Sequence, residues 1–418
     1  MARLRPLRCR ARPAGGQRRA RRGGPQTCGR HHAPYPRGRV VSRTVLVIAG
    51  EVSGDQRAAE VIRAVRAQHP DISFWGIGGP EMRAAGAETL HDIREMAVMG
   101  LVEVLRRYFF FRRVFNEMIA VAVTKKPDAV LLVDYPGFNL RFAAQMKQRG
   151  IKVIYYICPQ VWAWHRSRIP KMAQIVDRLL AIFPFEPEVF TGTNLKVDFV
   201  GHPLVDVAQA ARNASPRSLP WQGEPCIALL PGSRRQEIER ILPPIWQAAG
   251  IMQQQNPNAS FILAAPSEAV AKIVRATLAS LSNGPTKWEL VIDQTRAVLR
   301  QARAALVASG TATLETALMN CPMLVVYKTS LPTYLIGRQL IRVNHIGMVN
   351  LIAGRTVCPE FIQHDATPEK LAVALTPLLG ETTERAAQLT GLAEVATKLG
   401  APGAANRAAD ILLTELGA

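Results

Sequence analysis

Three loops, each following an apolar run and preceding a helix-like pattern, hold the residue types that bind anionic ligands. They read GEVSGD at residues 50–55, PGSRRQEI at 231–238 and ASGTATLE at 308–315. Free backbone amides at the start of a helix attract anions, and small residues allow a ligand to approach closely. The spacing matches neither the G-x-G-x-x-G of dinucleotide-binding folds nor the G-K-[ST] of a P-loop, which disfavours a hydride carrier or ATP.

The three loops offer different groups. We expect an anion or a sugar at the first loop, phosphate oxygens at the second, and a diphosphate with ribose or sugar hydroxyls at the third. The candidate ligands are Gly50, Glu51, Ser53, Gly54 and Asp55, then Ser233 and Arg234, then Ser309, Gly310, Thr311 and Glu315. Helix capping or an exposed arginine pair would explain the same residue types. Three such loops in one chain favour ligand binding.

Two further segments contain groups suited to catalysis or sugar binding. Asp134 ends the apolar run in LLVDYPGFN at 131–139, where a carboxylate is well placed to take a proton from an attacking hydroxyl. The alternative is a structural ion pair with a neighbouring arginine. In PQVWAWH at 159–165, Trp162 and Trp164 would form a flat wall for a sugar or an acyl chain, and a buried tryptophan pair is the alternative.

The segment RRYFFFRR at 106–113 combines aromatic rings with arginine pairs. We predict that it contacts a membrane, because rings enter the acyl boundary while arginines meet anionic head groups. The residues concerned are Arg106, Arg107, Tyr108, Phe109, Phe110, Phe111, Arg112 and Arg113. Burial of the rings in a domain face is the alternative.

Short apolar runs alternate with helix-like segments and would position these groups. One series covers residues 44–49, 72–77, 129–134, 151–157, 179–183 and 197–200, and a second covers 226–230, 261–265, 290–292, 304–308 and 323–327. A polar stretch at 204–223 separates them and is interpreted as a connection. Apolar strands that alternate with helices form parallel sheets covered on both faces. The sequence therefore predicts an α/β fold with two doubly wound, Rossmann-like domains facing a cleft.

We expect four segments: an extension at 1–42, a first domain at 43–205, a second domain at 206–380, and helices at 381–418 that pack back on the first domain. The formal charge of +20 falls to +7 once the thirteen arginines of residues 1–43 are set aside. This Arg/Gly/Pro-rich extension is predicted to be disordered, as a solvated tail or because the start codon is misassigned. Six scattered cysteines indicate reduced thiols. No apolar run approaches the ~20 residues that span a bilayer.

With these residues assembled, the chain closely resembles the lipid-A-disaccharide synthase family, which are inverting glycosyltransferases of the GT-B type. The resemblance runs from about residue 44 to the C-terminal helices. It rests on AGEVSGD at 49–55, AVMGLVEVL at 97–105, VWAW at 161–164, LLPGSR at 229–234, ASGTA at 308–312 and VNLIAGR at 349–355.

The resemblance implies transfer of 2,3-diacylglucosamine from UDP-2,3-diacylglucosamine to the 6-hydroxyl of 2,3-diacylglucosamine 1-phosphate (lipid X). The products would be the β-1,6 lipid A disaccharide 1-phosphate and UDP. It implies Asp134 as general base, Arg234 at the departing diphosphate, and a nucleotide side that includes Asn350 with Ser309, Gly310, Thr311 and Glu315. It implies no metal and no cofactor, and a place on the inner face of the inner membrane. A homodimer is left as an option. Gly137 stands where the family leads us to expect an acidic residue, so a helper carboxylate is missing.

Two other functions are weighed against this one. A non-hydrolysing UDP-sugar 2-epimerase would share the paired sheets and the phosphate loops, but it needs no lipid-facing surface, so the run of phenylalanines at 109–111 argues against it. A nucleic-acid-binding module would depend on the basic extension, and deletion of residues 1–42 would then abolish the main activity. We expect no nucleic-acid partner.

Overall fold

The computed structural model describes residues 43–96, 108–163, 166–330, 334 and 345–418. The N-terminal extension, the motif at 97–105, and the site candidates Arg106, Arg107 and Trp164 lie outside the described residues. No helix in the described ranges is long and apolar enough to cross a membrane.

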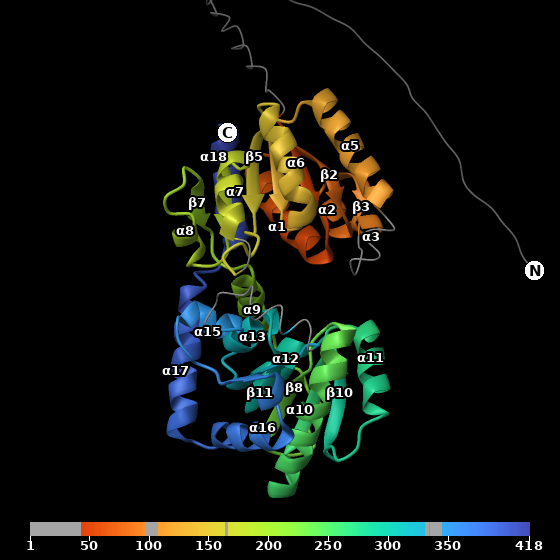
Figure 1. Ribbon diagram of the computed structural model, residues 1–418, viewed down its shortest axis with the longest axis vertical. Helices are drawn as coiled ribbons and strands as arrows, with labels where there is room; N and C mark the ends of the chain where they lie inside the picture. The colour runs from red at the N-terminus through yellow and green to blue at the C-terminus, as the bar shows by residue number, and fades with distance from the viewer. Residues whose placement is uncertain (1–42, 97–107, 164–165, 331–333, 335–344) are drawn as a thin grey trace, which may run out of the picture. The chain divides into compact units, whose positions relative to one another are not determined.

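Seven parallel strands form the first sheet, in the order β3-β2-β1-β4-β5-β6-β7 (Figure 1). Its strands are β1 (Thr44–Ala49), β2 (Ser73–Gly78), β3 (Glu88–Asp92), β4 (Ala129–Val133), β5 (Lys152–Tyr156), β6 (Arg178–Ala181) and β7 (Lys196–Phe199). Its helices include α1 (Val52–Gln68), α2 (Pro80–Ala84), α3 (Ile93–Met96), α5 (Tyr108–Lys125), α6 (Pro136–Gln148), α7 (Ile169–Ile175) and α8 (Glu186–Val189).

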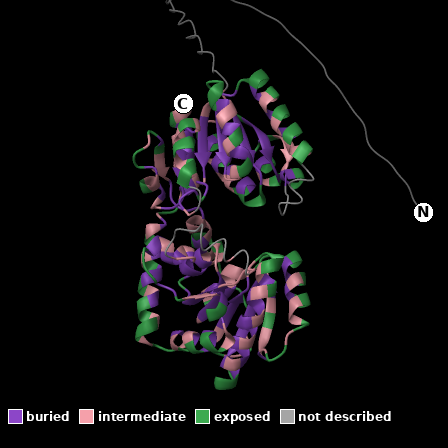
Figure 2. Ribbon diagram, in the orientation of Figure 1, coloured by how far each residue is buried: buried purple, intermediate pink, exposed green. Residues whose placement is uncertain are grey.

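Alternation along β1 explains why helices cover both faces of this sheet. Leu46 and Ile48 point to one face, where they belong to the core formed with α5, α6 and α7. Val45 and Val47 point to the other face, where they pack with α1. Figure 2 shows the central strands as buried and the helices as exposed on their outer sides. A strand buried on both faces must be apolar at every position, which is the pattern that the sequence predicted.

Six strands form the second sheet, in the order β10-β9-β8-β11-β12-β13, and every pairing is again parallel. Its strands are β8 (Cys226–Leu230), β9 (Ser260–Ala265), β10 (Trp288–Ile292), β11 (Ala304–Ala308), β12 (Met323–Tyr327) and β13 (Glu360–Ile362). Its helices include α10 (Arg235–Gln255), α11 (Glu268–Leu278), α12 (Thr295–Gln301), α13 (Thr311–Leu318), α15 (Met348–Ala353), α16 (Pro368–Leu375) and α17 (Thr383–Lys398). The prediction of two parallel α/β domains is confirmed.

The stretch between the two series of strands is not simply a loop. Its first half forms α9 (Leu204–Asn213), of which only Ala208 is buried. Leu204, Val205 and Ala211 of this helix pack partly buried against the core. The segment can therefore still serve as the connection that the sequence predicts.

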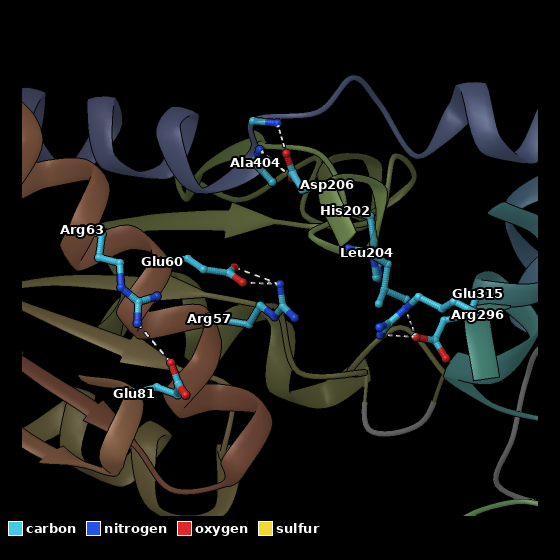
Figure 3. Close-up of polar contacts among 11 residues, drawn as sticks. Arg57, Glu60, Arg63, Glu81, His202, Leu204, Asp206, Arg296, Glu315 and Ala404 are labelled. Carbon is cyan, nitrogen blue, oxygen red and sulfur yellow. Dashed lines mark hydrogen bonds and ion pairs between the residues drawn. The ribbon is translucent and has the colours of Figure 1, made fainter. Parts of the chain in front are cut away.

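The last helix, α18 (Ala404–Leu416), packs against α1 of the first domain (Figure 1). The Glu415 carboxylate pairs with Lys152 Nζ at 2.9 Å and with Arg178 Nη1 at 3.2 Å. At the start of α18, the Asp206 carboxylate accepts the Gly403 amide at 2.6 Å and the Ala404 amide at 3.4 Å (Figure 3). The end of the chain is thus bonded to strands and helices that lie far earlier in the sequence.

The strand order of each sheet fixes where a ligand is expected. In the first sheet the chain moves outward from β1 to β3 and then returns to β4 on the other side of β1. In the second sheet the same reversal lies between β8 and β11. Ligands of open parallel sheets bind outside the strand carboxyl ends at such switch points. The three predicted loops and Asp134 follow these four strands.

Candidate active site

The first switch point brings the 50–55 loop next to Asp134. Ala49 at the end of β1 lies opposite Val133 at the end of β4, so the two following segments start side by side. Glu51 and Ser53 are exposed there, whereas Asp134 is partly buried. This edge of the sheet therefore joins exposed polar groups to a half-buried carboxylate.

The backbone at Asp134 is strained and held in place. Asp134 and Tyr135 both have left-handed backbones, with φ of 47° and 49°. Such conformations cost on the order of 1–3 kcal/mol each for residues other than glycine and persist where neighbours hold them. The Tyr155 hydroxyl donates to the Asp134 carbonyl at 2.6 Å, and Asn139 Nδ2 donates to the same oxygen at 2.7 Å. The sequence reasoning did not assign this positioning role to Asn139, although an asparagine on the buried face of a helix was a visible signal.

Burial changes the acidity of Asp134. Burial away from solvent is the main cause and the negative charge of Glu51 is the second, and together they raise the pKa of Asp134 to about 6. A hydrogen bond from the Tyr135 amide partly opposes this shift. A general base works best when its pKa lies near the working pH. Asp134 is therefore ionised at neutral pH and still basic enough to accept a proton from a hydroxyl.

The activity of this site should depend on pH through Asp134. Below pH ~6 the carboxylate is protonated, so we expect kcat/KM to fall about tenfold for each further pH unit. Because the charge of Glu51 contributes to the raised pKa, Glu51→Gln should move the inflection to lower pH. A pH–rate series on both proteins checks this. An inflection that stays in place in the variant would assign the titration to another group.

Gly50 has a steric role beside Asp134. A Cβ on Gly50 would lie 2.4 Å from Cδ1 of Tyr135, so only glycine leaves room for this ring. A Cβ on Gly54 would contact the Ala49 Cβ at 3.5 Å. The sequence predicts that small residues here let a ligand approach closely, but the space at Gly50 is taken by a side chain of the protein itself.

At the second switch point, Arg234 lies at the start of α10. Its guanidinium is exposed, and Nη1 bonds Glu237 at 2.7 Å. The Glu237 carboxylate also accepts the amides of Ser233 at 3.3 Å and Arg234 at 3.4 Å. These amides are the ones predicted to bind phosphate. A carboxylate already occupies the anion position, so a phosphate that binds there replaces Glu237.

The neighbouring loop after β11 is open. Gly310, the N-cap of α13, has φ of 148°, which favours glycine, and within the described residues no atom lies within 4 Å of where its Cβ would be. Ser309 Oγ donates to the Ile346 carbonyl at 3.1 Å, and Thr311 is exposed. Space beside Gly310 is therefore compatible with the prediction that a diphosphate binds to the amides that follow it.

Glu315 borders a hollow of about 410 Å³ on the same domain. Its Oε1 accepts Arg296 Nε at 3.1 Å and Nη2 at 2.7 Å (Figure 3), which fixes the carboxylate and leaves Oε2 for a ligand hydroxyl. Pro266 and Asp293, which follow β9 and β10, line the same hollow. The sequence reasoning missed Arg296 and Asp293, since single polar residues after strands carry no motif.

Glu315→Gln should weaken UDP binding about tenfold, because a charged acceptor of hydroxyl hydrogen bonds becomes neutral. Titration calorimetry with UDP measures the change in Kd. Glu268→Gln is the matched control, since Glu268 is an exposed, ion-paired residue of the same domain outside this hollow. Equal Kd values for wild type and Glu315→Gln would remove Glu315 from the nucleotide site.

Comparison with known proteins agrees with this geometry. A protein-family model described as lipid-A-disaccharide synthetase matches residues 45–412. The chain belongs to the lipid-A-disaccharide synthase family.

Curated members of the lipid-A-disaccharide synthase family align over nearly their whole length. The lipid-A-disaccharide synthase of Syntrophus aciditrophicus is 42% identical over 89% of this chain and 98% of its own. That of Geobacter metallireducens is 39% identical over 91% of this chain and 99% of its own. The chain is therefore a glycosyltransferase of lipid A biosynthesis that uses a UDP-sugar.

Solved structures support the fold of this chain. A putative UDP-N-acetylglucosamine 2-epimerase from Listeria monocytogenes superposes with a TM-score of 0.61 at 15% identity, covering 89% of this chain and 96% of its own. The calicheamicin glycosyltransferase CalG4 gives 0.56 at 15% identity, covering 90% and 98%. Both likenesses concern the GT-B-type fold alone.

Two residues of the predicted site have structural roles instead. The Asp55 carboxylate is buried and accepts the amides of Gly79 at 2.6 Å, Glu81 at 3.0 Å and Met82 at 3.1 Å, so it caps α2. Asn350 is fully buried, where its Oδ1 accepts the amides of Val357 and Cys358. The prediction that these side chains contact substrate is corrected, since neither reaches the surface.

Trp162 is also part of the core of the first domain. It is 5% exposed, it packs edge-on against Phe185 at 5.0 Å between ring centroids, and its indole N–H donates to Glu186 at 3.2 Å. Burial raises the pKa of Glu186 to about 7. The prediction of a sugar-facing wall is corrected for Trp162, and the alternative of a buried tryptophan fits its position.

The described part of the aromatic segment, residues 108–113, starts α5 and divides between surface and core. Phe109 is 78% exposed and Tyr108 is 49% exposed. Phe110 and Phe111 are partly buried against the first-domain core. Arg112 and Arg113 are exposed, and the Arg113 guanidinium lies 5.9 Å from the centre of the Phe110 ring. Two rings and two arginines are thus available to a membrane.

Proposed function

We propose that this chain transfers 2,3-diacylglucosamine from UDP-2,3-diacylglucosamine to the 6-hydroxyl of lipid X, with inversion and without a metal ion. The observation that carries the proposal is the half-buried Asp134, with its raised pKa, at the switch point of the first sheet. The open Gly310 loop and Arg234 at the switch point of the second sheet complement it. One domain supplies a base and the other supplies groups for a diphosphate.

The chemistry is a single displacement in this proposal. Asp134 takes the proton of the acceptor 6-hydroxyl while the hydroxyl oxygen forms a bond to C1 of the donor sugar. The bond from C1 to the diphosphate oxygen breaks, and its electron pair leaves with UDP. Attack opposite the departing UDP inverts the anomeric centre and gives the β-linkage. Transfer requires that the two domains bring Asp134 and the donor within reach of each other.

In this proposal, protein groups stabilise the negative charge of the leaving diphosphate. Arg234 supplies a permanent positive charge, and the amides after Gly310 supply oriented dipoles at a helix N-terminus. Glu237, which now holds the Ser233 and Arg234 amides, swings away when the diphosphate arrives. The positions of Ser309 and Thr311 beside Gly310 support the same assignment.

The place of action in this proposal is the inner face of the inner membrane. Both substrates carry acyl chains, so the enzyme must meet them at a bilayer surface. The exposed Tyr108 and Phe109 with Arg112 and Arg113 provide rings for the acyl boundary and charge for anionic head groups.

The test is UDP release by the full chain in neutral detergent micelles with UDP-2,3-diacylglucosamine, with and without lipid X. We expect release only with lipid X, a disaccharide product, and no change when EDTA is added. Release without acceptor, or conversion of the donor sugar to its 2-epimer, would contradict the transferase assignment. Loss of activity in EDTA that added Mg²⁺ restores would contradict the metal-free mechanism alone.

A further inference from the structure

Two neighbouring hollows on the first domain are not used by the chemistry described above. The first, about 550 Å³, lies between α5 and the start of α6, with Tyr135 in its wall. The second, about 610 Å³, lies between α6 and α7. Phe115, Gly137 and Arg141 line both, so the two hollows adjoin at the first turn of α6, which follows Asp134 closely in the sequence.

The first hollow is mostly aromatic. Phe115 and Phe138 meet edge to face at 5.3 Å between ring centroids, and Tyr135 lies 6.1 Å from Phe138. Tyr108 and Phe111 of α5 add two further rings, and the lining also includes the polar residues Arg112, Asn116 and Arg141. Such a surface binds hydrocarbon, because its burial releases water from apolar area. An acyl chain is the component of the substrates that fits it.

The second hollow is basic at its edge and apolar inside. Arg141, Arg168 and Lys171 line it with Leu140 and Met172. These three cations are exposed, and none forms an ion pair or side-chain hydrogen bond with another described residue. No described aspartate or glutamate lines either hollow. Elsewhere on the same domain arginines such as Arg57 and Arg178 have carboxylate partners.

We propose that the two hollows form one acceptor subsite, in which the aromatic hollow takes an acyl chain and the basic hollow takes the sugar phosphate. A phosphomonoester carries a charge of about −1.5 to −2 at neutral pH and binds to clustered cations through several oxygens. The donor carries no phosphomonoester, so these cations distinguish acceptor from donor. The subsite rests on the proposed function, since Tyr135, which lines the first hollow, directly follows the proposed base Asp134 in the chain.

The first test changes the cations. The double variant Arg141→Gln/Lys171→Gln should raise KM for lipid X about 10- to 100-fold in neutral detergent micelles, with KM for the donor unchanged. The control is Lys272→Gln, which removes an exposed charge from α11 of the other domain and should leave both constants unchanged. A normal KM for lipid X in the double variant, with a native melting temperature, would overturn the subsite.

The second test changes the ligand. Wild type should bind 2,3-diacylglucosamine lacking the phosphate about as weakly as the double variant binds lipid X, and the double variant should barely distinguish the two sugars. If the double substitution weakens the binding of both sugars by the same factor, the cations do not contact the phosphate. If the loss appears only with vesicles of anionic phospholipid and not in neutral micelles, the cations bind the bilayer and the proposal fails.

Binding without the donor separates this proposal from the proposed function. Intrinsic tryptophan fluorescence in micelles reports lipid X binding with no turnover. Preferential binding of lipid X over its dephosphorylated form, lost in the double variant, supports the subsite even if UDP is never released. Acceptor-dependent UDP release with no preference for the phosphate would leave the transferase in place and overturn the subsite.

Discussion

Asp134→Asn is expected to lower kcat by about 10²–10⁴-fold, because the variant keeps the size of the side chain and loses the base. Binding of UDP should be unchanged, since its loops belong to the other sheet. Rapid-quench turnover and UDP calorimetry measure the two quantities. Asp410→Asn is the control, because this exposed residue of α18 loses the same charge and keeps its bond from Gln68. More than a tenth of wild-type kcat in Asp134→Asn would exclude the carboxylate as the base.

Asp134→Asn should also increase the stability of the protein at alkaline pH. The pKa of Asp134 is raised from an unfolded value of 3.8 to about 6 in the native state, so the native state is favoured when this group is protonated. That contribution is present below pH ~4 and is lost as the pH rises through about 6. Removing the charge should therefore stabilise the protein at pH 8 by about 1–3 kcal/mol, and this gain should vanish near pH 4. Thermal melts at both pH values check the sign.

Arg234→Ala is expected to reduce kcat/KM for the donor by about 10²–10³-fold and to weaken the UDP complex. In the proposed mechanism the guanidinium supplies a fixed charge where negative charge develops, and the loss of one such group typically costs that factor. Steady-state kinetics and UDP calorimetry test both effects. Arg235→Ala is a closely matched control, since the adjacent arginine is also exposed and pairs with Glu239. An equal loss in Arg235→Ala would indicate a general effect of charge on the loop rather than a contact with phosphate.

Buried parallel strands were the part of the fold most visible in the sequence. The runs at 226–230, 304–308 and 323–327 coincide with β8, β11 and β12. The edge strands β3 and β13 were missed. In β3 the residues Glu88–Asp92 are mostly polar and only partly buried, and β13 has three residues. Neither β3 nor β13 has the apolar run that made the opposite edge strands β7 and β10 visible, so the pairing of β3 and β13 is decided by the neighbouring strand.

For the candidate site, too, some features could be predicted from the sequence and others could not. The sequence located the loops at both switch points, because glycine and small residues directly after an apolar run form a pattern that is visible within a few neighbouring residues. It could not separate residues that face the ligand from residues that hold the loop. Asp55 and Asn350 lie in motifs of the family, yet their side chains bond backbone amides inside the protein. Whether a motif side chain turns inward depends on contacts far along the chain, such as Asp55 with Gly79.

The packing of α18 on α1 has a consequence for biosynthesis. A chain emerges from the ribosome from its N-terminus, and domains usually fold in that order. Here Leu412 and Leu413 belong to the same apolar cluster as Val45 and Val47, and Glu415 bonds β5 and β6. The first domain therefore cannot bury its α1 face until the final residues are released. A premature stop codon near residue 400 would leave that face open and the nascent protein dependent on chaperones.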